Sequence, residues 1–373
     1  MEMRPFALER YFGKHEFTAK VLLSSSDCES LSLEELLDRA GPEADRLWRE
    51  LRLGYTEGAG HPLLRAEVAG LYREVRPAGV MVAAPEEAIF VAMHALLAAG
   101  DHVVAVAPAY QSLHELPRAI GCAVTPWTLR LGESGWGVDV DELERAITER
   151  TRMLVINFPH NPTGHQIGRA ELDRIVEIAR RHSLWLFSDE MYRLLEHDEA
   201  ERLPAVCDLY ERGISLSGLS KAFGLPGLRI GWLATREVGL VERWLAVKDY
   251  TTICSSAPSE VLAIVALQTK DWLLERSLKI VRGNLLAARL FFGERAAALA
   301  WAEPRAGSVA FPRWLGEGTI EQLCEDARAA KGLMIVPCSL FDYPGNHFRV
   351  GLGRKNLPAA LALLGEVLRE RSG

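Results

Sequence analysis

The sequence predicts an α/β fold with a mainly parallel central sheet and a second, smaller α+β domain. Short apolar runs alternate with segments of helical periodicity through the middle of the chain, which is typical of a sheet covered by helices. The chain has 373 residues, of which 49% are hydrophobic and 25% charged. Because single hydrophobic cores stop growing at roughly 250 to 300 residues, two domains are expected.

The first α/β unit is the clearest one. Residues 88–99 have the composition of a buried helix that begins near Pro85 and ends before Gly100, and strand-like residues 102–107 follow. A second helix is expected where apolar residues follow helical spacing, at 171–182. The other strands are expected where short apolar runs are bounded by polar residues or glycine, at 122–129, 153–158, 184–190, 214–218 and 230–234.

The two ends of the chain are expected to form the smaller domain. From about Asp271 onward, long helical stretches replace the alternation, and strand candidates at 308–314 and 347–353 precede a final helix at 357–371. We expect residues 1–40 to join the small domain, residues 41–280 to form the large one, and residues 281–373 to complete the small one.

The composition of the chain indicates which kinds of partner and which cellular location to expect. The net charge of -7 gives no electrostatic reason to expect nucleic acid or an anionic membrane. Six scattered cysteines have neither C-x-x-C nor histidine spacing, so we expect reduced thiols and no metal. The first residues do not resemble a signal peptide and no run of about 18 apolar residues occurs, so we expect a cytoplasmic protein without a membrane span.

The stretch with the most candidate catalytic and binding residues is 215–232, SLSGLSKAFGLPGLRIGW. A lone lysine is usually a solvated surface residue. Here, however, Lys221 lies among small residues and Arg229 follows eight positions later. An amine that forms imines and a guanidinium that matches phosphate oxygens suit a cofactor with both an aldehyde and a phosphate.

This stretch resembles the Schiff-base segment of class I/II aminotransferases, S-K-x-F-G-x-P-G-x-R-x-G. The resemblance implies a three-layer fold of type I, pyridoxal 5'-phosphate as cofactor, Lys221 as its Schiff-base lysine and proton carrier, and Arg229 as a phosphate ligand. Gly218 occupies the position where the family commonly has a serine. Ser217 or Ser220 is expected to supply that hydroxyl instead.

Two further motifs point to the same family. N-F-P-H-N-P-T-G resembles the family's N-P-x-N-P-T-G turn, in which Asn161 would donate to the oxygen of the pyridine ring and border the substrate; an ordinary Asn-Pro turn is the alternative. In S-D-E-M-Y, the resemblance assigns Asp189 to the protonated ring nitrogen and Tyr192 to the ring oxygen. For Asp189 the alternative is a helix N-cap.

Three residues outside these motifs also match the family. Tyr110 is expected to stack on the cofactor, or else to be a core tyrosine. Tyr55, in a Y-x-x-x-x-G-x-x-x-L-R stretch, would reach the phosphate of a neighbouring subunit, which implies a homodimer with shared active sites. Arg349 would clamp the substrate carboxylate, the alternative being an exposed strand arginine.

The chain also departs from the family. The turn that faces the phosphate contains Pro85, so the backbone N–H groups of Glu86 and Glu87 are candidate phosphate ligands. In the N-terminal segment, where the family usually has a glycine over the substrate, this chain has serines, and Ser25 is a candidate substrate ligand. That segment resembles capreomycidine-synthase-like members, which eliminate from and cyclise an arginine derivative. Asp27, Glu57 and Glu86 could then line a pocket for a cationic side chain.

The resemblance implies an aminotransferase that moves an amino group from an L-α-amino acid to a 2-oxo acid through the pyridoxamine form of the cofactor. The alternative is a lyase or cyclase on the same scaffold, acting on a basic amino acid. A non-catalytic ligand sensor is disfavoured because the chain leaves no room for a DNA-binding module. A nicotinamide-dependent oxidoreductase is disfavoured because no G-x-G-x-x-G follows a strand.

Overall fold

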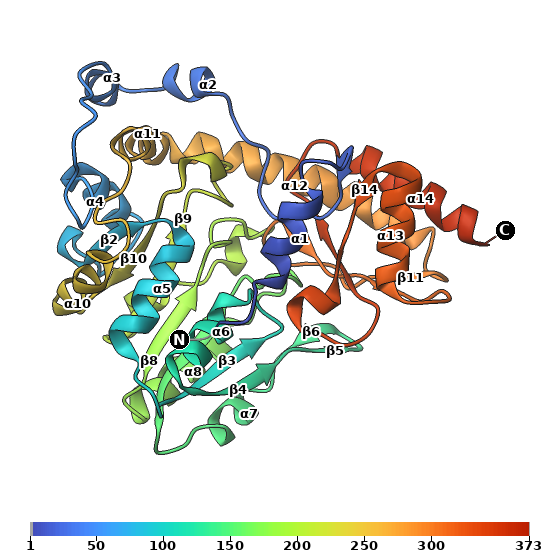
Figure 1. Ribbon diagram of the computed structural model, residues 1–373, viewed down its shortest axis with the longest axis horizontal. Helices are drawn as coiled ribbons and strands as arrows, with labels where there is room; N and C mark the ends of the chain where they lie inside the picture. Colours follow the sequence, from blue (N-terminus) through green and yellow to red (C-terminus); the bar gives the residue numbers. More distant parts are fainter. Residues whose placement is uncertain (1–2, 373) are drawn as a thin grey trace.

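The computed structural model describes residues 3–372 and has a seven-stranded sheet at its centre (Figure 1). The strand order is β2-β10-β9-β8-β7-β3-β4, and only β10 runs antiparallel to its neighbours. The strands are β2 (Val80–Ala83), β3 (His102–Ala107), β4 (Ala123–Thr128), β7 (Thr151–Asn157), β8 (Trp185–Asp189), β9 (Gly213–Gly218) and β10 (Gly231–Thr235). The predicted α/β class with a mainly parallel sheet is confirmed.

Helices pack against this sheet. For example, α5 contacts β2, β9 and β10, while α6 contacts β3 and β4 and α8 contacts β8. The helices of this part are α2 (Leu33–Leu37), α3 (Pro42–Arg49), α4 (Pro62–Ala69), α5 (Pro85–Leu96), α6 (Ser112–Ile120), α7 (Val140–Arg145), α8 (Arg169–Arg181), α9 (Val206–Leu209), α10 (Gly239–Lys248) and α11 (Ala257–Gln268). A small hairpin, β5 (Arg130–Gly132) with β6 (Gly135–Gly137), follows β4.

The predicted strands of the sheet are present to within two residues, but β2 was missed. The predicted first helix begins at Pro85, as expected, yet ends at Leu96 instead of continuing to residue 99. Its C-cap residue, Leu97, is extended, so the chain leaves the helix before Gly100. The predicted strand at 308–314 is divided into β12 (Val309–Ala310) and β13 (Arg313–Trp314), with Pro312 between them.

The C-terminal part contains short strands and long helices. The helices are α12 (Lys270–Gly293), α13 (Ile320–Lys331) and α14 (Leu357–Ser372), and the strands are β11 (Leu299–Ala300), β14 (Leu333–Met334), β15 (Val336–Pro337) and β16 (Phe348–Gly351), with β12 and β13. In Figure 1, α12 runs from beside α11 into this part of the molecule. The expected boundary between the two domains, residue 280, lies within this one continuous helix.

The N-terminal segment contacts the C-terminal part directly. Its strand β1 (Val21–Leu22) pairs in parallel with β14, and helix α1 (Ala7–His15) contacts the turn at residues 338–341. Two glycines let residues 23–29 run close to β16: a Cβ on Gly351 would lie 1.9 Å from the carbonyl oxygen of Ser25, and one on Gly353 would lie 2.2 Å from that of Asp27. These contacts fix the segment next to the sheet edge where the site lies.

Within residues 3–372, no helix is long and apolar enough to cross a membrane. Over the same range, no cluster of three or more histidine, cysteine, aspartate or glutamate side chains could hold a metal ion. All six cysteines are free thiols, and five of them are buried.

Candidate active site

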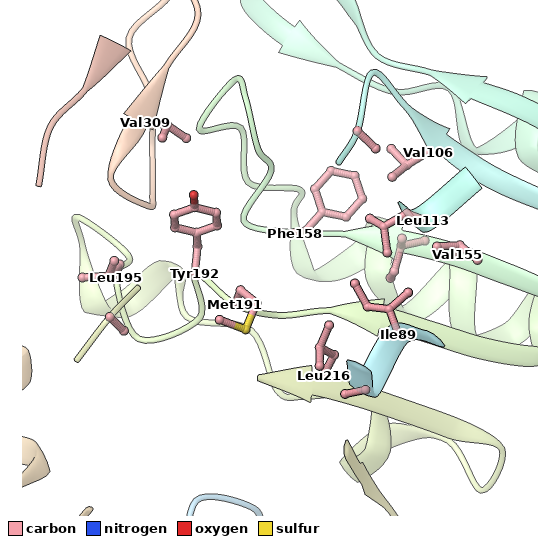
Figure 2. Close-up of a cluster of buried hydrophobic side chains, with 14 of the residues drawn as sticks. Ile89, Val106, Leu113, Val155, Phe158, Met191, Tyr192, Leu195, Leu216 and Val309 are labelled. Carbon is pink, nitrogen blue, oxygen red and sulfur yellow. The ribbon is translucent and has the colours of Figure 1, made fainter. Parts of the chain in front are cut away.

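A pocket of about 430 Å³ lies where the chain leaves the carboxyl ends of β7, β8 and β9. Ligands of open α/β sheets bind at this edge. Ile89, Met191 and Leu216 are among its apolar lining residues, and their side chains belong to the hydrophobic cluster in Figure 2. Ten predicted site residues line it: Ser25, Glu86, Tyr110, Asn161, Asp189, Tyr192, Ser220, Lys221, Arg229 and Arg349.

Lys221 follows β9 and brings its amine into this pocket. Its Nζ donates a hydrogen bond to Ser26 Oγ at 2.8 Å. Burial lowers the pKa of Lys221, with nearby Arg349 acting in the same direction, and Asp27 and Asp189 oppose the shift. A lysine with a lowered pKa has more of the neutral amine that forms an imine and accepts a proton.

Asp189 is the last residue of β8 and is 7% exposed. Burial raises its pKa to about 6, although the N–H of Met191 (3.1 Å) and the charge of Lys221 favour the carboxylate. Turns rather than a helix follow Asp189, so the N-cap alternative is wrong. A protonated ring nitrogen would stabilise this carboxylate, as the cofactor's chemistry requires.

Replacing Asp189 by asparagine is expected to change how stability depends on pH. Without cofactor, the folded protein holds the proton of Asp189 more tightly than the unfolded chain, whose pKa is near 3.8. Stability from this group therefore falls as the pH rises from about 4 through about 6, and the loss is about 3 kcal/mol. Asp189→Asn should remove this part of the decline in urea unfolding curves at pH 4 to 8.

Bound cofactor is expected to offset the loss of stability that ionised Asp189 causes at high pH. At pH 8, pyridoxal phosphate should raise the unfolding midpoint of the wild type more than that of Asp189→Asn, because only the carboxylate pairs with a protonated ring nitrogen. Asp38→Asn, at an exposed position, is the control. Identical pH profiles and identical cofactor responses in wild type and Asp189→Asn would contradict this assignment.

Arg349 is buried at 1% exposure, so the exposed-arginine alternative is wrong. Its Nε donates to the carbonyl of Ser24 (3.1 Å) and its Nη1 donates to Asn161 Oδ1 (3.2 Å). The guanidinium carbon lies 5.7 Å from the ring centre of Phe12 and 5.4 Å from that of Phe341. Nη2 is buried and has no hydrogen-bond partner among the described residues. The Arg349 Nη2 group, near the rings of Phe12 and Phe341, is therefore suited to bind a substrate carboxylate.

The phosphate end of the pocket combines Arg229, Ser220 and the first turn of α5. Arg229 has a positive φ of 56° and its Nη1 donates to the carbonyl of Pro226 (2.9 Å). Ser220 Oγ is buried without a partner in the described chain. Glu86 lines the pocket, accepts a hydrogen bond from Ser112 Oγ (3.1 Å), and has a pKa raised to about 7, chiefly by burial. A protonated Glu86 would not repel an anion.

Tyr110 and Tyr192 are both held by hydrogen bonds. Tyr110 donates to Glu9 Oε1 at 2.6 Å, and burial raises the pKa of this phenol strongly. Tyr192 donates to the carbonyl of Ser26 at 3.2 Å. In Figure 2 its ring points from the loop after β8 toward the segment that carries Val309. Because Tyr110 lines the pocket, it is not solely a core residue.

Three predicted cofactor ligands do not line the pocket. Ser217 is buried within β9. The Glu87 side chain accepts hydrogen bonds from Thr251 and Thr252 on another surface, and the contact predicted for its backbone N–H stays a prediction. Tyr55 is 92% exposed and borders a different, shallow pocket. Its predicted contact with a neighbouring subunit stays a prediction. Glu57 lies beside Tyr55, so within one chain it does not join Asp27 and Glu86 in an acidic lining.

Five polar or aromatic lining residues were not assigned to the site from the sequence: Glu9, Phe12, Glu16, Ser26 and Arg354. Glu9, Phe12 and Glu16 have the spacing of one helix face, i, i+3 and i+7, and this periodicity in the N-terminal segment was the signal available. Arg354 pairs with Asp27 at 2.8 Å.

The fold and the site together define a pyridoxal-phosphate-dependent enzyme of fold type I. The chain belongs to the class I and II aminotransferase family, whose model, "Aminotransferase class I and II", matches residues 18–361. The family prediction and the cofactor prediction are thereby confirmed.

The chain is similar to both transferases and cyclases of this family. It is 35% identical to capreomycidine synthase of Streptomyces vinaceus, covering 97% of this chain and 93% of that protein. It is 31% identical to a probable N-succinyldiaminopimelate aminotransferase of Mycobacterium tuberculosis, covering 78% and 75%. Among solved structures, a PLP-dependent aminotransferase from Streptococcus suis matches with a TM-score of 0.92 and 29% identity, covering 99% of each chain. The PLP-dependent cyclase OrfR matches with 0.91 and 28%, covering 100% and 98%.

Proposed function

We propose that this enzyme is a cyclising lyase, which removes a β-substituent from a basic L-α-amino acid, an arginine derivative, and closes a ring. The substrate class in this proposal rests on the acidic lining of the pocket, and the reaction class rests on the similarity to capreomycidine synthase. Asp27 is paired with Arg354. Glu9 and Glu16 also line the pocket, and no salt bridge within the described chain engages either of them, although Glu9 accepts a hydrogen bond from Tyr110. The similarity over nearly the whole chain to capreomycidine synthase supports the same reaction class.

Helix α1 is the recognition element in this proposal. Glu9 and Glu16 present carboxylates beside Phe12, whose ring faces the Arg349 guanidinium. Burial raises the pKa of Glu16, so a cation at this position would restore its charged form. A guanidinium fits two carboxylates because it offers a planar fork of donors. A neutral side chain would form no ion pair with either carboxylate.

The cofactor, when bound, supplies an electron sink for the carbanion at the substrate α-carbon. Arg349 and Asn161 hold the α-carboxylate, and Asp189 keeps the proton on the ring nitrogen. Arg229, Ser220 and the N–H groups at the start of α5 hold the phosphate. Lys221, once its amine is free, removes the α-proton, and its lowered pKa keeps more of that amine neutral.

A single-turnover reaction tests this function. Cofactor-loaded protein is mixed with 3-hydroxy-L-arginine, and separately with L-arginine, while the cofactor spectrum is followed and products are identified by mass. We expect 3-hydroxy-L-arginine to lose water, giving an eliminated or cyclised product while the cofactor returns to its starting spectrum. Accumulation of the pyridoxamine form with a 2-oxo acid from both substrates would contradict the lyase proposal.

Transamination, the activity that the resemblance implies first, is the second candidate. It is supported by the similarity to the Mycobacterium tuberculosis aminotransferase, and by 33% identity to an arginine–pyruvate transaminase of Pseudomonas aeruginosa over 48% of this chain. The acidic lining suits a basic amino acid in both reactions. The fate of the α-proton separates them, because transamination delivers it to the cofactor.

A further inference from the structure

The hydroxyl of Ser26 is the one side chain hydrogen-bonded to the Lys221 amine within the described chain, at 2.8 Å. Ser26 also lines the pocket, as Lys221 does, so its hydroxyl lies beside the amine at the edge of the space for the substrate. The family usually has a glycine over the substrate in this segment. A hydroxyl here therefore adds a group that can accept and donate protons.

The backbone of Ser26 is held firmly. Its carbonyl accepts hydrogen bonds from Ser308 Oγ (2.8 Å) and from the Tyr192 hydroxyl (3.2 Å). Two residues earlier, Ser24 Oγ donates to the carbonyl of Arg349 (2.5 Å) and accepts from the N–H of Val336 (2.9 Å).

The glycines of β16 and the following loop hold the same segment in place. The close approaches of Gly351 to Ser25 and of Gly353 to Asp27 leave the segment no room to withdraw toward β16. The position of the Ser26 hydroxyl is thus determined by the fold, as a proton-transfer group requires.

We propose that Ser26 is a further catalytic residue, which relays a proton from Lys221 to the departing β-substituent of the substrate. This inference rests on the proposed lyase function. Elimination of a β-hydroxyl breaks the Cα–H and Cβ–O bonds, forms a Cα–Cβ double bond and releases water. Without a proton donor the leaving group would be hydroxide, which is a poor one.

The relay moves one proton from the substrate α-carbon to the leaving group. Lys221 takes the α-proton and becomes an ammonium group. The Ser26 hydroxyl gives its proton to the β-oxygen as the Cβ–O bond breaks, and Ser26 Oγ takes a proton from the Lys221 ammonium along their existing hydrogen bond. Lys221 and Ser26 end as they began, and the α-proton has in effect moved to the departing water.

The test separates removal of the α-proton from loss of the leaving group. Ser26→Ala and wild type, both cofactor-loaded, are compared in two reactions: exchange of the α-hydrogen of L-arginine with deuterated water, and release of water from 3-hydroxy-L-arginine. We expect Ser26→Ala to slow water release by about 100-fold, the low end for a lost general acid, and to leave α-exchange within about threefold. Ser26→Thr should retain most of the activity, and Ser30→Ala, at an exposed position of the same segment, should match wild type.

A second readout needs no cofactor. The rate at which an amine reagent labels Lys221 in the cofactor-free protein is measured against pH. Because the Ser26 oxygen stabilises the ammonium form by accepting its hydrogen bond, Ser26→Ala should shift the labelling midpoint to lower pH. An unchanged midpoint would show that the contact with Lys221 is not made in solution, which overturns the relay.

The remaining outcomes are distinguishable. If Ser26→Ala slows exchange and water release equally, Ser26 only positions Lys221 and the relay is wrong. If neither rate changes, Ser26 has no catalytic role. If wild type itself releases no water, the lyase function fails and the relay with it, whereas failure of the relay alone leaves wild type active.

Discussion

Replacing Lys221 by alanine is expected to abolish covalent attachment of the cofactor and to lower turnover by at least about 10³-fold. The variant loses the amine that bonds the aldehyde and also the base that removes the α-proton, and general acid–base catalysis alone contributes 10²- to 10⁴-fold. Asp189 and Arg229 remain in the pocket, so noncovalent binding of pyridoxal phosphate should persist.

The attachment is measured by borohydride reduction of the cofactor-loaded protein, followed by peptide mass analysis. We expect the reduced cofactor on the peptide that contains Lys221, and no labelled peptide from Lys221→Ala. Lys279→Ala, at an exposed position of α12, should be labelled and active like wild type. Label on another lysine of the wild type would contradict the assignment.

Replacing Arg349 by lysine is expected to raise the KM for the amino acid by about 100-fold, with a smaller effect on kcat. Lysine keeps the charge but lacks the planar fork that binds a carboxylate through two parallel hydrogen bonds. The variant also loses the contacts of Arg349 with Ser24 and Asn161. Truncating one partner of a buried charged pair costs roughly 2 to 5 kcal/mol.

Steady-state rates give KM and kcat, and spectral titration of the cofactor-loaded variant with substrate measures the loss of binding without turnover. Arg313→Lys is a matched control because Arg313 is exposed on the neighbouring strand β13. An unchanged KM for Arg349→Lys, combined with a large loss in kcat, would place Arg349 in the chemistry instead of in carboxylate binding.

The fold and the cofactor end of the site could largely be predicted from the sequence because their signals are local. The strand ends that carry Asn161, Asp189 and Lys221 lie in continuous motifs with apolar runs before them. In a parallel sheet, the carboxyl ends of such strands meet at one edge. Strand β2 was missed because four residues, Val80–Ala83, give too short a run to be distinguished from the helix that follows.

The substrate end could not be predicted in the same way, because it is assembled from distant segments. Glu9 meets Tyr110, and Ser26 meets Lys221, across 101 and 195 residues of sequence. The sequence signal for Glu9 was only its helical spacing, and the signal for Ser26 was only an unusual run of serines. The loop that carries Tyr55 and Glu57 lies beside α11, away from β8 and β9 of the same chain, so a contribution of Glu57 to this pocket stays a prediction.

Recognition of a basic side chain is tested by the ratio of affinities for L-arginine and L-citrulline, read from the spectrum of the cofactor-loaded enzyme. The two amino acids have nearly the same shape, but only arginine has a cationic side chain. We predict a preference for arginine of about 100-fold, since hydrogen bonds to charged groups contribute roughly 1.5 to 3 kcal/mol. The preference should nearly vanish in a Glu9→Gln, Glu16→Gln double variant and persist in Glu177→Gln, an exposed control. Equal affinities in wild type would contradict recognition of a basic amino acid by the acidic face of α1.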